Sequence, residues 1–134
     1  GVRIRPHNHK PREIALFHNT IVAAALGVGM NGAEEGHERL FAHNLVYGNP
    51  ALQSEIGGEN HTGDFERARM ELADLSPDPA RFDLALRRNV PAPQSALDSR
   101  WLDLPGARED RIGRRRATPV FGACVSDAAA AACR

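Results

Sequence analysis

One short segment occurs twice in the chain, and this repeat limits the possible folds more than any other feature. The segments "HNTIV" at 18–22 and "HNLVYGNP" at 43–50 start 25 positions apart, and each leads into a glycine-containing turn. A period of 20–50 residues indicates structural units that stack on one another. The alternative is a chance match between two His-Asn dipeptides.

If the two segments stack, their polar side chains form a row. Equivalent strands of successive units lie about 4.8 Å apart, which lets asparagine amides hydrogen-bond along the stack as in amide ladders. The predicted polar ladder has four members: His18, Asn19, His43 and Asn44. We interpret its two histidines as part of the ladder rather than as a catalytic pair.

The composition favours strands over a helical bundle. With 134 residues, the chain fits one domain. Aromatic residues make up 5% of it, whereas there are 12 glycines and 9 prolines, a balance typical of short strands separated by turns. Val2 and Ile4 alternate with arginines, which predicts a strand. Good helix formers from Asp64 to Leu75 predict one short helix capped by Asp64.

The charge balance and the apolar runs argue against two classes of partner. The 17 basic and 17 acidic residues cancel, so we expect no nucleic-acid partner. The longest apolar run, 21–30, contains two glycines and is much shorter than the about 20 residues that a helix needs to cross a bilayer. We therefore expect no transmembrane segment.

Four fragments, taken in order, carry a resemblance to a known family. They are "HNTIV" (18–22), "HNLVYGNP" (43–50), "DPARFDLALRRNVPAPQSALD" (78–98) and "DRIGRRRATPVFGACV" (110–125). Together they resemble the C-terminal portion of right-handed parallel β-helix proteins, among them polysaccharide lyases and related secreted carbohydrate-active proteins. The chain departs from that pattern at "QSALD" and "GACV", and its cysteine-containing tail is unusual.

The repeat and the resemblance together predict an all-β fold. It is a right-handed parallel β-helix segment of two to three coils, with a C-terminal capping region and one short helix. We assign 1–55 to the coils, 56–77 to a loop and the short helix, and 78–134 to the cap and tail. The resemblance also implies that the protein is secreted or periplasmic.

The resemblance implies three functions that the residues do not separate. The first is a non-catalytic structural or binding module within a larger protein or a multi-subunit assembly. The alternative is a polysaccharide lyase-type enzyme, which acts by β-elimination and whose site missing coils would complete. The third is a carbohydrate-binding module. We expect no lyase activity from the isolated chain, because two or three coils are too few to line a long groove.

Two basic segments hold the candidate site residues. The weak catalytic candidates, all in "PHNHKPR", are His7, His9, Lys10 and Arg12; a solvated loop is the alternative. The cluster "RIGRRR" at 111–116 would hold an acidic polysaccharide, or else form the polar part of the cap. The turn "EEGHE" at 34–38 would gather carboxylates around calcium if the protein is lyase-like. Otherwise we expect no cofactor and no metal site.

Two cysteines near the C-terminus predict a disulfide. Cys124 and Cys133 lie nine positions apart and would close a small loop in an oxidising compartment. The alternative is a pair of free thiols in the cytosol. A disulfide would agree with the secreted or periplasmic location that the resemblance implies.

The N-terminal strand pattern predicts a partner. The chain opens on "GVRIR", without a preceding helix or polar loop, so the first strands would leave backbone N–H and C=O groups unpaired. We expect residues 2–5 and 14–17 to pair with another polypeptide. That polypeptide is either upstream coils, a different subunit or a second copy of the chain.

Overall fold

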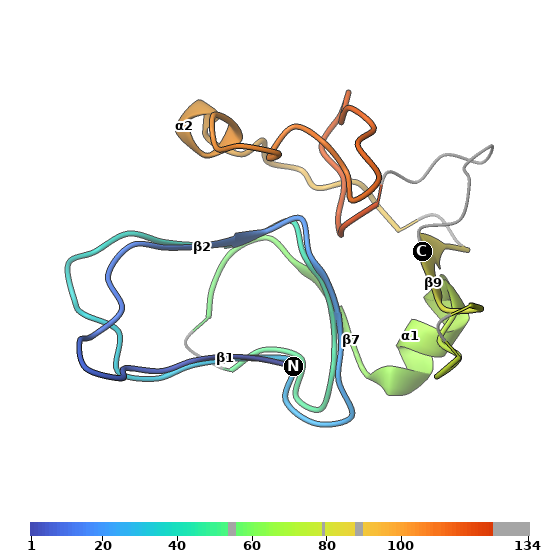
Figure 1. Cartoon of the computed structure of the whole chain (residues 1–134), viewed down its shortest axis with the longest axis horizontal. Helices are drawn as coiled ribbons and strands as arrows, with labels where there is room; N and C mark the ends of the chain where they lie inside the picture. The colour runs from blue at the N-terminus through green and yellow to red at the C-terminus, as the bar shows by residue number, and fades with distance from the viewer. Residues whose placement is uncertain (54–55, 79, 88–89, 125–134) are drawn as a thin grey trace.

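Short strands dominate the computed structural model, which describes residues 1–53, 56–78, 80–87 and 90–124 (Figure 1). The strands are β1 (Val2–Ile4), β2 (Ile14–Phe17), β3 (Thr20–Val22), β4 (Val28–Met30), β5 (Arg39–Ala42), β6 (Leu45–Tyr47), β7 (His61–Gly63), β8 (Leu72–Asp74) and β9 (Asp83–Leu86). The helices are α1 (Phe65–Glu71) and α2 (Ser99–Leu102). None of the described helices has the length and apolar character needed to cross a membrane.

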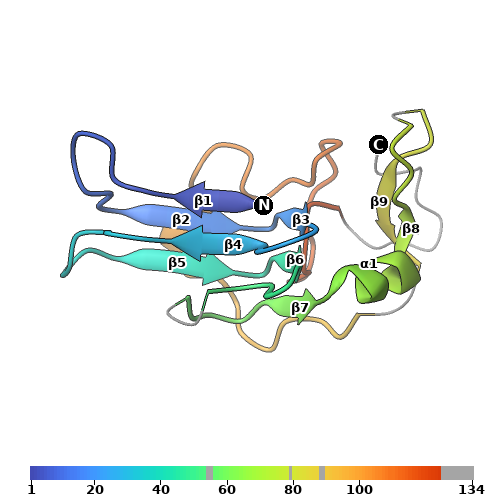
Figure 2. The ribbon, with the colours of Figure 1, turned by 90° about the horizontal axis from the view of Figure 1, so that it is seen from below.

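Strands β1 to β7 pair in parallel within three small sheets. β1 pairs with β4, β2 pairs with β5, and β6 lies between β3 and β7 (Figure 2). In the register, Ile14 faces Arg39 and Thr20 faces Leu45, which is the 25-residue spacing of the repeat. The two His-Asn segments therefore lie side by side, because equal spacing brings equivalent residues into register.

The predicted right-handed parallel β-helix is nevertheless wrong. The described residues form separate sheets of two or three strands, each strand three or four residues long, and no solenoid closes around an axis. A solenoid requires each turn of the chain to extend every sheet. Here a third turn adds β7 beside β6, but beyond β4 it adds only an isolated bridge from Val28 to Leu52. The chain then continues into α1 and the antiparallel pair β8–β9.

Two apolar clusters form the core. The buried residues of the first, between β4, β5 and β6, are Val28, Met30, Phe41, Val46 and Ile56. Those of the second, between β6, α1 and β8, are Leu45, Tyr47, Ala68, Leu72 and Phe121. Phe121 belongs to the C-terminal segment, so the second cluster fastens that segment to the strands by burial of apolar surface.

Local sequence signals set the start and the end of α1. The Asp64 carboxylate accepts a hydrogen bond from the N–H of Arg67 at 2.8 Å, which is the geometry of an N-cap. This confirms the short helix expected after Asp64. The backbone becomes extended at Leu72 and enters β8, which pairs with β9 with Leu72 opposite Leu86.

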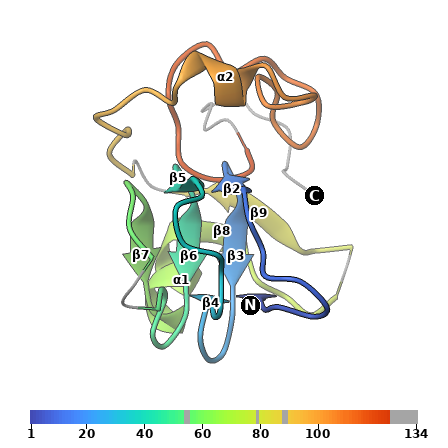
Figure 3. The same ribbon diagram turned by 90° about the vertical axis from the view of Figure 1, so that its left-hand side faces the viewer.

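The C-terminal segment, 94–124, lies against the bends that join the strands (Figure 3). Gly122 allows the closest approach, since its N–H donates to the carbonyl oxygen of His43 at 2.9 Å. Its φ is 82°, and a Cβ there would lie 2.6 Å from Cδ1 of Leu45 and 2.7 Å from Oγ1 of Thr20. Only glycine fits this backbone conformation and this spacing without a shift of the neighbours.

The predicted disulfide is not found among the described residues. Its second half, Cys133, lies outside them, in the segment 125–134. Cys124 is the one cysteine of the described part, where it is buried at the end of the C-terminal segment. The predicted pairing of Cys124 with Cys133 therefore lies outside the described residues.

Candidate functional site

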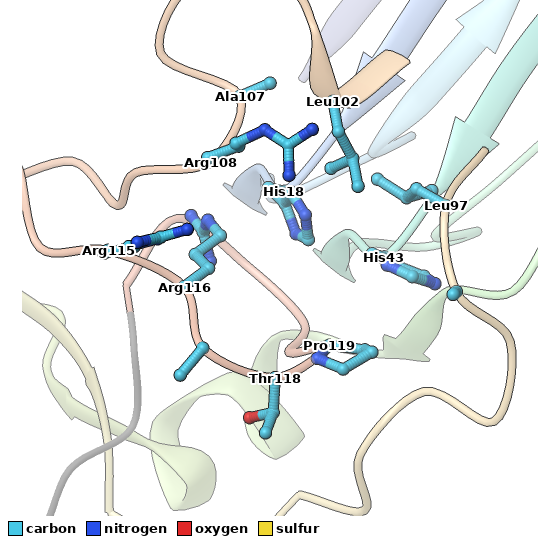
Figure 4. Close-up of a pocket in the computed structure, with 12 residues that line it drawn as sticks. His18, His43, Leu97, Leu102, Ala107, Arg108, Arg115, Arg116, Thr118 and Pro119 are labelled. Atoms are coloured by element: carbon cyan, nitrogen blue, oxygen red, sulfur yellow. The ribbon is translucent and has the colours of Figure 1, made fainter. Parts of the chain in front are cut away.

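A cavity of about 560 Å³ lies between the strand bends and the C-terminal segment (Figure 4). Its floor comes from the bend between β2 and β3 and the bend between β5 and β6, and its walls come from 96–102 and 107–119. The lining residues are His18, His43, Ala96, Leu97, Leu102, Ala107, Arg108, Arg115, Arg116, Ala117, Thr118 and Pro119. The cavity is therefore made by two parts of the chain that are far apart in sequence.

Two histidines form the bends at the floor of the cavity. His18 lies between β2 and β3 with a φ of 55°, and His43 lies between β5 and β6 with a φ of 56°. A positive φ is uncommon outside glycine, and histidine is among the residues enriched there. The two ring centroids are 5.4 Å apart. Each copy of the repeat thus turns the chain and places one imidazole beside the other.

Three asparagines hold these bends in place. Oδ1 of Asn44, a residue 1% exposed, accepts hydrogen bonds from the backbone N–H of Asn19 at 2.9 Å and from its Nδ2 at 3.1 Å. Nδ2 of Asn44 donates to the Leu16 carbonyl and to Oδ1 of Asn60, both at 2.8 Å. The repeat did not reveal Asn60, because it follows Asn44 by 16 positions and precedes a histidine instead of following one.

The fold decides the tautomer of His18. Nδ1 lies 3.0 Å from the carbonyl oxygen of Val120. A carbonyl only accepts hydrogen bonds, so Nδ1 of the neutral ring carries the hydrogen and Nε2 keeps a lone pair. Burial, followed by the charge of Arg116 and the neighbouring His43, lowers the pKa of His18 to about 4. At neutral pH the ring therefore offers an acceptor and not a cation.

His43 is the most enclosed polar side chain at the cavity. It is 1% exposed, and neither ring nitrogen has a hydrogen-bond partner among the described residues. Burial lowers the pKa of His43, while the Glu59 carboxylate and the backbone of Ser95 act in the opposite direction. The Ser95 backbone lies close to the ring but does not have the geometry of a hydrogen bond. An unpaired buried imidazole is costly, and a polar molecule in the cavity would reduce that cost.

Arg116 is the most buried of the arginines in the cavity wall. Its Nε donates to the Glu109 carbonyl and its Nη2 to the Ala123 carbonyl, both at 3.1 Å. Its Nη1 is buried and has no partner among the described residues. Arg108 differs, because it is exposed and pairs with Asp103 at 3.2 Å. Two nitrogens of the Arg116 guanidinium are therefore fixed by backbone carbonyls, and the third, Nη1, has no partner among the described residues.

The charged side chains in the described lining of the cavity are all positive. Its described lining includes three guanidinium groups and no carboxylate. Two of them, Arg115 and Arg116, come from the predicted arginine cluster at 111–116. Burial lowers the pKa of Arg116 and Asp110 opposes that shift, but a guanidinium stays protonated in proteins. The arrangement suits an anion, since paired guanidinium N–H groups match the geometry of carboxylate and phosphate.

The predicted catalytic loop lies away from this cavity. All four candidates are exposed between β1 and β2, and none of them lines the cavity: His7, His9, Lys10 and Arg12. Arg12 instead forms an ion pair with Glu34 at 2.8 Å. The structure therefore does not bring the loop together with the polar ladder.

Two glutamates of the acidic turn at 34–38 form ion pairs with arginines from other segments. Glu34 pairs with Arg12, and Glu38 pairs with Arg100 of α2. In the described part of the chain, no three His, Cys, Asp or Glu side chains are grouped so that they could hold a metal ion. The calcium expected for a lyase-like protein stays a prediction.

A second polar network connects α1 to the strands. The hydroxyl of the fully buried Tyr47 donates to Oε2 of Glu71 at 2.7 Å, and Nε2 of His61 lies 2.8 Å from the same oxygen. Nε of Arg67 donates to Oε1 at 2.8 Å. Burial alone would raise the pKa of Glu71, but these hydrogen bonds lower it below its usual value. The sequence did not reveal the network, since its members come from three elements with no common spacing.

No protein-family model, curated protein or solved structure matches the chain. The resemblance to right-handed parallel β-helix proteins thus has no support from these comparisons, and the separate sheets contradict it. Apolar residues that alternate with glycine and proline turns are typical of many β proteins, so four short fragments in order did not identify a family. Function has to be argued from the site itself.

Proposed function

We propose that the chain is a non-catalytic binding module that holds the carboxylate of an acidic sugar in the cavity below the C-terminal segment. The observation that carries the proposal is the group of three guanidinium side chains, Arg108, Arg115 and Arg116, at a cavity with no carboxylate in its described lining. A ligand carboxylate would accept hydrogen bonds from these guanidinium groups beside apolar walls, which strengthens a charge-assisted hydrogen bond.

The site favours binding over catalysis. A general base works best when its pKa lies near the working pH, and the pKa of His18 is about 4. The basic loop at 7–12, which supplied the candidates for a lyase, does not line the cavity. The cavity also combines polar groups with apolar walls at Leu97 and Leu102. A sugar acid presents the same combination, with a carboxylate, hydroxyls and an apolar ring face.

Arg116→Gln is expected to weaken the binding of a short oligogalacturonate by about tenfold or more, since hydrogen bonds to charged groups contribute roughly 1.5–3 kcal/mol. Isothermal titration calorimetry measures the affinity. Arg111→Gln is the matched control, because Arg111 is exposed on the same segment and lies outside the cavity lining. The affinity of the Arg111→Gln variant should stay within about twofold of the wild-type value, since salt screens exposed charges.

Two results would contradict this proposal. One is equal binding of the oligogalacturonate and of a neutral oligosaccharide of the same length. The other is the same loss of affinity in Arg111→Gln as in Arg116→Gln, which would assign the binding to the net charge of the segment and not to the cavity.

The outer edge of β1 supports a second role, assembly with another polypeptide. Within the described residues, β1 pairs on one side only, with β4. The N–H of Val2 and the carbonyl of Ile4 face β4, so the backbone groups of Arg3 point outward by the alternation of a strand. Free edges of this kind accept a further strand. We propose a second copy of the chain as the partner, because two identical short edges can pair with each other.

We expect two copies of the wild-type chain to pair through β1. Arg3→Pro is expected to prevent this pairing, so that the variant is a monomer with an intact fold. Proline has no N–H, and at this position it removes only a donor that points away from β4. Light scattering over a range of concentrations measures the mass, with Arg5→Pro, beyond the end of β1, as the control. A wild-type chain that remains a monomer at high concentration, with fast amide exchange at Arg3, would exclude this pairing.

A further inference from the structure

The cavity presents two different kinds of hydrogen-bonding group. Figure 4 shows Arg115 and Arg116 on one side of His18, the guanidinium of Arg108 above its ring, and Leu97 on the other side. The arginines donate hydrogen bonds and carry charge, whereas the free nitrogen of His18 accepts a hydrogen bond and carries no charge. A ligand that satisfies both sides needs an anionic group and a separate donor.

The carbonyl of Val120 determines what can face His18. Because it takes the hydrogen of Nδ1 at 3.0 Å, the lone pair of the ring is on Nε2, on the opposite side of the imidazole. An anionic oxygen against that lone pair would be repelled, while a hydroxyl would donate to it. The neutral form of His18 is itself favoured by its surroundings, which include Arg116 and the His43 ring at 5.4 Å.

The anionic group belongs at Arg116. Arg116 lines the cavity, and the Glu109 and Ala123 carbonyls fix its guanidinium through Nε and Nη2. The guanidinium is close enough to His18 for its charge to act on the imidazole. One small ligand can therefore engage both groups, with its anion at Arg116 and its donor at His18.

We propose, on the basis of the function proposed above, that His18 makes the cavity selective for a hydroxy-carboxylate. The carboxylate accepts from the guanidinium of Arg116, and a hydroxyl on the neighbouring carbon donates to Nε2 of His18. The apolar face of the ligand ring lies against Leu97 and Leu102. Plain carboxylates lack the donor.

Two ring carboxylates that differ by one hydroxyl isolate this contact. They are cyclohexanecarboxylate and 2-hydroxycyclohexanecarboxylate, the latter used as its separate cis and trans isomers. In an NMR titration, the wild-type chain is expected to bind one hydroxylated isomer about fivefold to tenfold more tightly than the plain acid, which is the effect of one hydrogen bond to a partly buried acceptor. His18→Asn keeps a residue that tolerates the positive φ of 55°, and it should remove this preference.

A second measurement on the wild-type chain does not depend on that variant. In protein labelled with ¹⁵N-histidine, the Nε2 resonance of His18 should shift when the hydroxylated acid binds and stay in place when the plain acid binds. Arg111→Gln should keep both the preference and the shift.

The outcomes separate this inference from the proposed function. Equal affinity for the two carboxylates, with binding lost in Arg116→Gln, would overturn the role of His18 and leave the binding function standing. Tighter binding of inorganic phosphate than of the hydroxy acid would also overturn it, because the cavity would then not select a carboxylate with a neighbouring hydroxyl. No binding of any carboxylate, of phosphate or of the oligogalacturonate would overturn both.

Discussion

Asn44→Leu is expected to lower the free energy of unfolding by about 3–5 kcal/mol, because several buried polar groups lose a hydrogen bond at once. Leucine fills a similar volume but has neither an amide nor a carbonyl. It would remove the acceptor of the backbone N–H of Asn19 at 2.9 Å and the amide that donates to the Leu16 carbonyl and to Oδ1 of Asn60, both at 2.8 Å. Oδ1 of Asn60 would keep only the backbone N–H of position 44, at 3.1 Å. Urea denaturation followed by circular dichroism measures the loss.

Asn8→Leu is the control for this substitution. Asn8 is exposed between β1 and β2, so the same change there should alter stability by no more than about 0.5 kcal/mol. A loss below about 1 kcal/mol for Asn44→Leu would mean that water replaces the missing partners. The row of asparagines would then not be what holds the two bends together.

Glu71→Ala is expected to lower the free energy of unfolding by about 2–4 kcal/mol, since it leaves the buried Tyr47 hydroxyl without an acceptor and removes the partner of Arg67. The Tyr47 side chain is fully buried, so water does not replace the carboxylate easily. Thermal denaturation measures the loss. The double variant Tyr47→Phe/Glu71→Ala should be less destabilised than the sum of the two single variants, because both remove the same contact.

Glu66→Ala on the same helix is the matched control. Its carboxylate lies 3.6 Å from Arg69, and both side chains are exposed, so the change should stay within about 0.5 kcal/mol. The pH dependence adds a second check. Since the folded chain holds the pKa of Glu71 below its usual value, its stabilisation is present above about pH 4.5 and is lost as the pH falls through the lowered pKa. Glu71→Gln should flatten this acid limb, and an unchanged limb would contradict the assignment.

Local parts of the fold could be predicted because they depend on short-range patterns. The spacing of the two His-Asn segments set the parallel register of β2 with β5 and of β3 with β6. Asp64 marked the start of α1 because a carboxylate can satisfy free N–H groups of the first helical turn. The prediction that these strand pairs continue into a β-helix was wrong for a physical reason. Two copies specify one pair of strands, and nothing in them requires the following residues to repeat the same turn.

The candidate site was predicted only in part, because its two sides come from distant segments. His18 and His43 were recognised as polar members of a repeat, but the neighbours that give them chemistry lie beyond residue 95. No spacing connects Arg116 or Val120 to His18. Their approach depends on Gly122, which lets the backbone come close to the β5–β6 bend, and on Phe121, which is buried in the second cluster.

The sequence by itself therefore determined the elements whose hydrogen bonds follow a regular spacing: the parallel strand pairs, the row of stacked His-Asn segments and the capped helix. Only the tertiary structure decided that the strands stop at separate small sheets and that a cationic cavity forms beside His18. The physical reason is the range of the interactions. Register and capping depend on residues at fixed offsets, whereas the cavity, the tautomer of His18 and the unpaired donor of Arg116 arise where the C-terminal segment packs against the bends.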